Sequence, residues 1–200
     1  MINIIVVEDQ RLVREAISAL LTLDDNFKVL AEAEHGLVAL PLIKQLKPDI
    51  VLTDIEMPEM SGIELIEQLV ADEVETKTVI MTTFSRSGYI KRALTAGVAG
   101  FILKEAPSQQ LIAAIKKVMT GEKVIDTELA ISALGDDDPL STKERKALKL
   151  ASAGLKTSEI AKQLFLSEGT VRNYLSEAIA KLNATNRIDA ARIAQQKGWL

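Results

Sequence analysis

The chain lacks cysteine altogether and has a single histidine, His35, among its 200 residues. Without cysteine it can form no disulfide and no thiolate metal site, which fits a reducing compartment such as the cytoplasm. With one histidine, a zinc site built from several histidines is excluded, and a Ser-His-Asp triad would have to use His35. The chain therefore offers no thiol-based site and no site with more than one imidazole.

Long apolar runs are missing as well. No stretch reaches the roughly 18 consecutive apolar residues that a membrane helix needs. The N-terminal MINIIVVEDQ has neither the basic start nor the cleavage site of a signal peptide. We therefore expect a cytoplasmic protein without membrane insertion. Apolar residues still make up 48% of the chain, enough for one large domain or two small ones.

Charge is divided unevenly along the chain. Residues 1–120 carry 12 Lys+Arg and 17 Asp+Glu, residues 121–138 carry 1 and 6, and residues 139–200 carry 11 and 5. The net charges are thus −5, −5 and +6. An acidic front and a basic tail favour two domains with different partners, although such a division also arises by chance in short segments. We place the front domain at 1–120, a linker at 121–138 and the tail domain at 139–200.

The first 120 residues alternate short apolar runs with stretches of helical spacing. The apolar runs, rich in β-branched residues, lie at 2–7, 28–31, 50–53, 78–81 and 100–103. Strands that alternate with helices predict an α/β domain, here a doubly wound, five-stranded parallel sheet with helices on both faces. Pro41 lies inside the second helical stretch, so it should kink or delay that helix.

The pattern changes after Gly121. Residues 121–138 have the composition of a linker, with a short helix near 128–134 and a solvated loop at the aspartates 136–138. From there on the spacing is helical throughout, which predicts a smaller, all-α domain of four helices. Helix N-caps are expected at Ser141, Thr157, Ser167 and Thr185 or Asn186.

Charged and polar residues follow the predicted strands of the front domain. In DIVLTDIEMPEMSG an apolar run leads directly to Asp54, and the first strand ends in Glu8 and Asp9. Thr82 follows the fourth strand and Lys104 the fifth. Because ligands of open parallel sheets lie beyond the carboxyl ends of the strands, these groups should converge. Each of them alone would also suit an ordinary loop or surface position.

Three carboxylates at one sheet edge would repel one another, and a hard cation such as Mg²⁺ would remove that cost. Lys104 and Thr82 could then hold phosphate oxygens, and Asp54 could act as a nucleophile toward phosphorus. Pro58 and Gly62 would shape the loop that exposes Asp54.

Residues 1–120 resemble a two-component receiver domain, which has a flavodoxin-like fold, in VVEDQ, DIVLTDIEMPEMSGIEL, VIMTTF and AGVAGFILK. The resemblance implies that Asp54 accepts a phosphoryl group from a sensor histidine kinase. It implies that Glu8 and Asp9 form the acidic pair, with Asp9 a direct Mg²⁺ ligand. Asp54 and the backbone carbonyl of Glu56 would complete the protein's share of the metal shell.

The same resemblance gives roles to the ends of the last two strands. Thr82 and Lys104 would bind the phosphoryl oxygens, and Phe101 would hold the switch aromatic position and turn inward on phosphorylation. Many receivers have proline after this lysine, whereas this chain has Glu105. A cis peptide bond there would cost about 3–4 kcal/mol, which leaves the geometry of this loop open.

Two helices of the tail fit a helix-turn-helix, with a scaffold helix at 157–164 and a recognition helix at 168–182. The side chains left free on the recognition helix are Thr170, Arg172, Asn173, Ser176 and Lys181. Arginine can bind guanine and asparagine adenine in the major groove, while Lys162 and Lys181 can hold phosphates. The alternative is a plain four-helix domain with a solvated, charged face.

The stretch TSEIAKQLFLSEGTVRNYLSEAIAKL makes the tail resemble the DNA-binding domain of the LuxR/FixJ (NarL) type. The resemblance implies that Arg172, Asn173 and Ser176 lie near base edges and that Thr170 and Tyr174 lie nearer the DNA backbone. The fourth helix would be the dimer surface. The two resemblances together imply a response regulator that is phosphorylated on Asp54, forms a homodimer and binds double-stranded promoter DNA to regulate transcription.

Two other functions remain open. A phosphohydrolase with an aspartyl-phosphate intermediate would make the chain an enzyme, which we do not expect. Such chemistry usually has a second aspartate two residues after the nucleophile, where this chain has Glu56. A transcription factor independent of phosphorylation would use the front domain only to dimerise, but it would not need the full set of pocket residues.

Overall fold

The structure is a computed structural model that describes residues 1–83, 86–132 and 137–200, apart from the side chains of residues 128 and 132. The chain divides into two compact units, one built mainly from residues 1–132 and the other mainly from residues 133–200. No helix among these described residues has both the length and the apolar character to cross a membrane.

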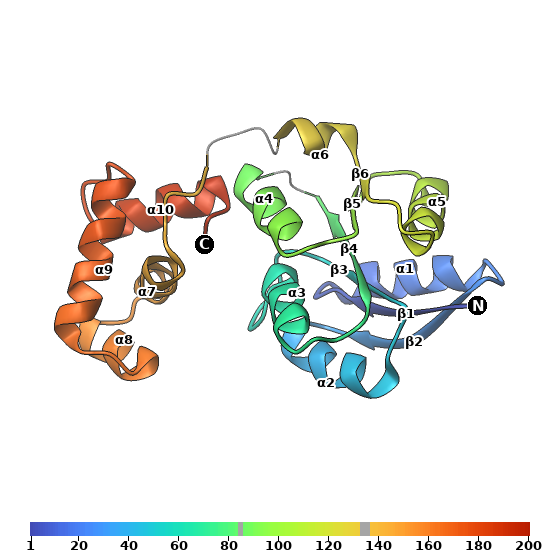
Figure 1. The fold of residues 1–200 in the computed structure, drawn as a ribbon, viewed down its shortest axis with the longest axis horizontal. Helices are drawn as coiled ribbons and strands as arrows, with labels where there is room; N and C mark the ends of the chain where they lie inside the picture. The colour runs from blue at the N-terminus through green and yellow to red at the C-terminus, as the bar shows by residue number, and fades with distance from the viewer. Residues whose placement is uncertain (84–85, 133–136) are drawn as a thin grey trace. The chain divides into compact units, whose positions relative to one another are not determined.

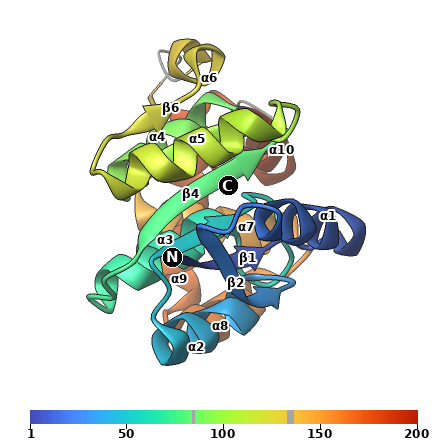
Figure 2. The same cartoon turned by 90° about the vertical axis from the view of Figure 1, so that its right-hand side faces the viewer.

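The first unit is built on a parallel sheet in the strand order β2-β1-β3-β4-β5-β6 (Figures 1 and 2). The strands are β1 (Ile2–Val7), β2 (Phe27–Ala33), β3 (Ile50–Thr53), β4 (Lys77–Thr82), β5 (Gly100–Leu103) and β6 (Val124–Ile125). The first five coincide with the predicted apolar runs, which confirms the doubly wound parallel sheet. The predicted count of five strands is corrected to six by β6.

Both faces of the sheet are buried under helices. In β1, Ile4 and Val6 pack on one face with α1 (Arg11–Thr22) and α5 (Ser108–Met119). Ile5 and Val7 pack on the other face with α2 (Gly36–Leu46) and α3 (Gly62–Ala71). The fourth helical connection, α4 (Ser87–Thr95), joins β4 to β5. Burial on both faces explains why these strands are continuously apolar instead of alternating.

Pro41 does not delay α2, which begins at Gly36 and continues past the proline to Leu46. The expectation of a delayed helix is therefore wrong. Ala39 and Ile43 of the same helix are fully buried, whereas Pro41 is exposed. A proline within a helix costs about 3 kcal/mol. We attribute the continued helix to the apolar side that it buries.

The segment that we predicted as a linker is ordered in its first half. The N–H of Val124 donates to the carbonyl of Ala99 over 3.1 Å, and the N–H of Asp126 donates to that of Phe101 over 3.1 Å. These bonds attach β6 to β5. The short helix α6 (Thr127–Ser132) follows, close to the expected helix near 128–134. Residues 133–136, which include the end of that expected helix, lie outside the described residues.

The second unit consists of α7 (Thr142–Ser152), α8 (Thr157–Leu164), α9 (Glu168–Lys181) and α10 (Arg187–Lys197). Leu148, Ile160 and Val171 are fully buried in its core. This confirms the all-α domain of four helices. The predicted caps Ser141, Ser167 and Asn186 each accept a backbone N–H at their helix start.

One predicted cap is wrong. Thr157 is the first residue of α8, and Lys156 occupies the N-cap position. The N–H of Lys156 donates to Oε2 of Glu159 over 2.6 Å. The acidic side chain three residues on thus satisfies the N-cap amide, and no hydroxyl cap is needed.

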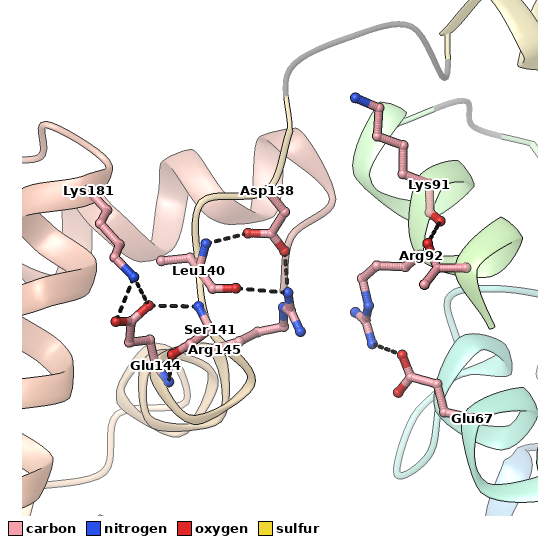
Figure 3. A network of polar contacts seen from close by, with 10 residues as sticks. Glu67, Lys91, Arg92, Asp138, Leu140, Ser141, Glu144, Arg145 and Lys181 are labelled. Carbon is pink, nitrogen blue, oxygen red and sulfur yellow. Dashed lines mark hydrogen bonds and ion pairs between the residues drawn. The ribbon is translucent and has the colours of Figure 1, made fainter. Parts of the chain in front are cut away.

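The last aspartate of the predicted solvated loop is held in place (Figure 3). Asp138 accepts the N–H of Leu140 over 2.8 Å and forms an ion pair with Arg145 of α7. Both side chains are less than a fifth exposed. The expectation of a solvated loop is therefore wrong at Asp138, while Asp136 lies outside the described residues.

Candidate functional site

The carboxyl ends of β1 and β3 bring three carboxylates together. The two strands are neighbours, with Val7 paired to Thr53, so the residues that follow leave the sheet side by side. Glu8, Asp9 and Asp54 each place a carboxylate oxygen within 4.8 Å of the others. Glu8 and Asp54 are buried, and Asp9 is exposed. The convergence expected from a parallel sheet is present at this edge.

Lys104 reaches into the same cluster from the end of β5. Its Nζ lies 2.7 Å from Oε2 of Glu8 and 3.0 Å from Oδ2 of Asp54. All three side chains are at most 10% exposed. The backbone N–H of Lys104 donates to the carbonyl of Thr82 over 2.9 Å, which fixes where the lysine leaves the sheet. The described peptide bonds, that of Lys104 to Glu105 included, are all trans.

The electrostatics of the cluster combine burial with an excess of negative charge. Burial raises the pKa of Asp54 and of Glu8, against the opposing effect of the hydrogen bonds from Lys104. Burial also acts to lower the pKa of Lys104, but its hydrogen bonds to Glu8 and Asp54 outweigh this and raise that pKa. The cluster thus has one ammonium and three carboxylates, and a further cation would balance the remaining negative charge.

The donor set fits a hard divalent cation. Mg²⁺ binds carboxylate and other oxygen ligands and usually needs only one or two protein carboxylates. Glu8, Asp9 and Asp54 offer such oxygens at mutual distances within 4.8 Å. These residues would hold the ion, which would supply positive charge next to phosphoryl oxygens.

Thr82 and Phe101 lie on the neighbouring strands β4 and β5. Thr82 is buried and is paired with Leu103, one residue before Lys104. The ring of Phe101 is already fully buried, packed in a strand that pairs with β4 on one side and β6 on the other. The resemblance implies that this ring turns inward on phosphorylation, but in this structure it is buried already.

The loop after Asp54 depends on a close backbone approach. A Cβ atom added to Gly62 would lie 1.9 Å from the carbonyl oxygen of Asp54. That same oxygen accepts the hydroxyl of Thr53 over 2.9 Å. Ser61 and Glu64 form a capping box at the start of α3 and so fix the far end of the loop.

The residues predicted to contact DNA divide into two groups. Those whose side chains are exposed are Lys162, Arg172, Asn173, Ser176 and Lys181. Thr170 and Tyr174 are half-buried. Tyr174 packs against the core of the second unit, and the hydroxyl of Thr170 lies 2.8 Å from that of Ser167.

Lys181 has a partner that sequence reasoning missed (Figure 3). Its Nζ lies 2.8 Å from both carboxylate oxygens of Glu144, whose side chain is only 3% exposed. Burial raises the pKa of Glu144, but the hydrogen bonds from Lys181 and from the N–H of Ser141 outweigh it and lower that pKa to about 2. The capping-box pattern indicated Glu144, but nothing in the sequence indicated that Lys181 would be its partner.

Comparison with known proteins gives matches in both units. Residues 4–116 match the family model of the response regulator receiver domain, and residues 138–194 match that of bacterial regulatory proteins of the luxR family. The chain is 43% identical over 200 residues to an uncharacterized transcriptional regulatory protein, YvfU, of Bacillus subtilis, with all of both chains covered. It is 40% identical to the transcriptional regulatory protein DesR of the same organism, covering all of this chain and 99% of DesR.

Among solved structures, it is similar to RcsB from Salmonella enterica serovar Typhimurium, bound to promoter rprA in the presence of the phosphomimetic BeF₃⁻. That match has a TM-score of 0.72 and 25% identity, and it covers 97% of this chain and 98% of RcsB.

Proposed function

Because this chain belongs to the two-component response regulators that join a receiver domain to a LuxR-type DNA-binding domain, we propose that phosphorylation of Asp54 controls its binding to promoter DNA. The observation that carries the proposal is the cluster of Asp54 with Glu8, Asp9 and Lys104. We assign residues 1–120 to the receiver, 121–138 to the linker and 139–200 to the DNA-binding domain. DNA as the target implies work in the cytoplasm.

The phosphoryl donor is a sensor histidine kinase. An oxygen of the Asp54 carboxylate attacks phosphorus, and the bond from phosphorus to the donor nitrogen breaks, its electron pair staying with the donor. The Nζ of Lys104 lies 3.0 Å from Oδ2 of Asp54 in this structure, so it can bind an oxygen of a phosphoryl group attached there. Glu8, Asp9 and Asp54 would hold Mg²⁺, and the backbone carbonyl of Glu56 would contribute a further oxygen.

Phosphorylation changes charge at the ends of β3, β4 and β5. The acyl phosphate carries about 1.5 to 2 negative charges in place of the single charge of the carboxylate, and its oxygens attract Lys104 and the hydroxyl of Thr82. Since the Phe101 ring is already buried, the repacking involves the surroundings of β4 and β5 more than an inward turn of this ring. Phosphorylation thereby favours one of two conformational states of the receiver over the other.

The phosphorylated form pairs with a second copy and binds DNA. A dimer sets two recognition helices on neighbouring half-sites. The similar RcsB structure is bound to promoter rprA in the presence of the phosphomimetic BeF₃⁻, which supports a link between phosphorylation and DNA binding. Of the exposed residues on α9, Arg172, Asn173 and Ser176 face base edges.

The DNA backbone is contacted by residues around this row. Lys162, Thr170 and Tyr174 are assigned to it, because phosphate contacts set the position of a recognition helix without reading sequence. Lys181 joins them only if it shares its ammonium between a phosphate and Glu144, which it now contacts.

The decisive experiment is the intact mass of the protein after incubation with phosphoramidate and Mg²⁺. The wild type should gain the mass of one phosphoryl group, and Asp54→Ala should gain none. Asp25→Ala, which removes an exposed aspartate elsewhere in the receiver, should behave as the wild type. Equal mass gain in Asp54→Ala and wild type would refute the assignment.

A further inference from the structure

The turn between α8 and α9 exposes an aromatic side chain. Phe165 directly follows α8 and is 94% exposed, more than any other large apolar residue in the part of the chain that the structure describes. Its neighbour Leu166 is 36% exposed. Single exposed apolar residues are common on protein surfaces, so exposure alone gives this ring no role. Two further observations, the backbone conformation and the place of the turn before α9 (Figure 1), distinguish Phe165 from the others.

Phe165 ends α8 in a backbone conformation that suits glycine. Its φ is 55°, in the left-handed region, and its N–H donates to the carbonyl of Lys162 over 3.3 Å. The N–H of Leu166 donates to the carbonyl of Ala161 over 2.9 Å. Glycine is the usual residue in this helix-ending motif, because a side chain is disfavoured at such angles. Gly198 ends α10 with a φ of 71°. The phenylalanine therefore costs the fold stability, and its exposed ring gains no burial in return.

The turn lies directly before the helix that we assign to base recognition. Ser167 caps α9 by accepting the N–H of Thr170, and only Leu166 separates Phe165 from this cap. From Phe165 to Glu168, the first residue of α9, the backbone spans at most about 11 Å. In a helix-turn-helix the N-terminal residues of the second helix contact base edges in the major groove. When α9 lies in that groove, the ring of Phe165 is within reach of it.

Positive charge favours DNA as the partner of this surface. Exposed Lys162 and Arg172 precede and follow the turn, and residues 139–200 carry 11 Lys+Arg against 5 Asp+Glu. Such a surface attracts the phosphates of DNA. In the major groove the apolar group that a base edge offers is the 5-methyl group of thymine, and phenylalanine is one of the side chains that contact it. The chemistry of the ring thus matches a feature of the groove that α9 enters.

We propose that Phe165 contacts the methyl group of a thymine in each half-site and takes part in reading the DNA sequence. The proposal rests on the proposed function, because it requires that α9 binds promoter DNA. Arg172, Asn173 and Ser176 recognise bases through hydrogen bonds, and a methyl group offers none. Phe165 adds an apolar contact to this set, and the contact removes its ring from water.

The test uses the full-length protein treated with BeF₃⁻ and a duplex that the wild type enriches from a random-sequence pool. Each thymine of the duplex is replaced in turn by deoxyuridine, which lacks only the methyl group. At one position in each half-site the replacement should weaken wild-type binding about fourfold, the effect of burying one methyl group. Phe165→Gly and Phe165→Asn should weaken binding to the unmodified duplex at least as much, and deoxyuridine at that position should change their affinity no further.

Both replacements tolerate the left-handed conformation, so they remove the ring without disturbing the turn. Asn183→Gly is the matched control, because Asn183 is exposed and has a φ of 50°. It lies beyond the opposite end of α9, roughly 20 Å away. Its affinity for the duplex should equal that of the wild type. In urea unfolding Phe165→Gly should be no less stable than the wild type, and a lower stability would mean that the ring supports the fold, against the proposal.

Three outcomes of the binding experiment contradict the proposal in different ways. Wild-type affinity unchanged by every deoxyuridine replacement, or an equal loss in Phe165→Gly and wild type at the same position, would overturn the contact with thymine. A loss of affinity in Phe165→Gly that accompanies loss of the dimer in solution without DNA would place the ring at a subunit interface instead. A wild type that enriches no duplex would overturn the proposed function, and this inference with it.

Discussion

At the scale of the residue, the position of Asp54 depends on a neighbour that carries no side chain. A Cβ on Gly62 would approach the Asp54 carbonyl oxygen to 1.9 Å and the Thr53 hydroxyl to 2.9 Å. Both atoms would have to move, and the first belongs to the backbone. We therefore expect Gly62→Ala to lower the free energy of unfolding by about 1–3 kcal/mol and to slow mass gain from phosphoramidate.

Gly169→Ala serves as the comparison for Gly62→Ala. A Cβ at Gly169 would meet only the Ser167 hydroxyl at 3.7 Å, an ordinary contact. Because alanine favours a helix over glycine, by up to roughly 1 kcal/mol in a helix interior, this variant in the first turn of α9 should be no less stable than the wild type. Urea unfolding of both variants checks the difference, and equal stability of the two would contradict the close-approach argument.

The residues of the acidic cluster could be predicted because each follows a strand directly. Glu8, Asp54 and Lys104 needed only the order of strands and the rule that parallel strands end at one edge. The contacts of Tyr89 with Glu56 and of Lys181 with Glu144 could not be predicted in this way. Their partners are 33 and 37 residues apart, and each contact depends on how a helix is turned and packed.

At the scale of the element, the start of α7 is held by a buried carboxylate. Glu144 has a pKa of about 2, below the ordinary 4.5, because its ionised form is hydrogen-bonded to Lys181 and to the N–H of Ser141. A lowered pKa stabilises the fold above pH 4.5, and this stabilisation is lost as the pH falls toward 2. Glu144→Gln should cost about 2 kcal/mol at pH 7 and should remove this part of the pH dependence.

Trp199 provides the readout for that variant. It is the only tryptophan of the chain and is buried in the core of the second unit, so its fluorescence reports urea unfolding there. Glu159→Gln is the matched control, because Glu159 holds the same capping position in α8 but is exposed. A loss of stability in Glu159→Gln as large as in Glu144→Gln would exclude a special role for the buried pair.

The elements that sequence reasoning missed are short or decided by packing. β6 has two residues, too few for any periodicity to show. Its place follows from the free edge of β5, which is a property of the assembled sheet. The continuation of α2 through Pro41 likewise reflects burial of Ala39 and Ile43, which local rules do not include.

At the scale of the whole molecule, positive charge is concentrated at one end of the chain. Residues 139–200 carry 11 Lys+Arg and 5 Asp+Glu, whereas residues 1–120 carry 12 and 17. The division agrees with a DNA-binding domain attached to an acidic receiver, and it predicts that affinity for DNA falls with rising salt. It does not by itself say which residues read sequence.

Two variants distinguish contacts that recognise the DNA sequence from non-specific electrostatic attraction to the DNA backbone. On the specific duplex, Arg172→Ala should weaken binding of the BeF₃⁻-treated protein by about 1–3 kcal/mol, with a much smaller loss on random duplex. Lys162→Ala should weaken both about equally and reduce the slope of affinity against salt by about 1. Titrations of each variant with both duplexes at several salt concentrations check this. An equal loss of affinity on both duplexes for Arg172→Ala would show that Arg172 contacts the DNA backbone and not a base.

The short strand β6 has a further effect on how these molecules meet in solution. Without it, the backbone carbonyls of Phe101 on β5 and of Ala99 just before β5 would form an open edge along which another chain could add a strand. Val124 and Asp126 occupy those groups, and the outermost strand is then only two residues long, with Lys123 and Asp126 at its ends. Short edge strands flanked by charged residues resist edge-to-edge aggregation. Self-association of the receiver is therefore directed away from this side and toward its helices.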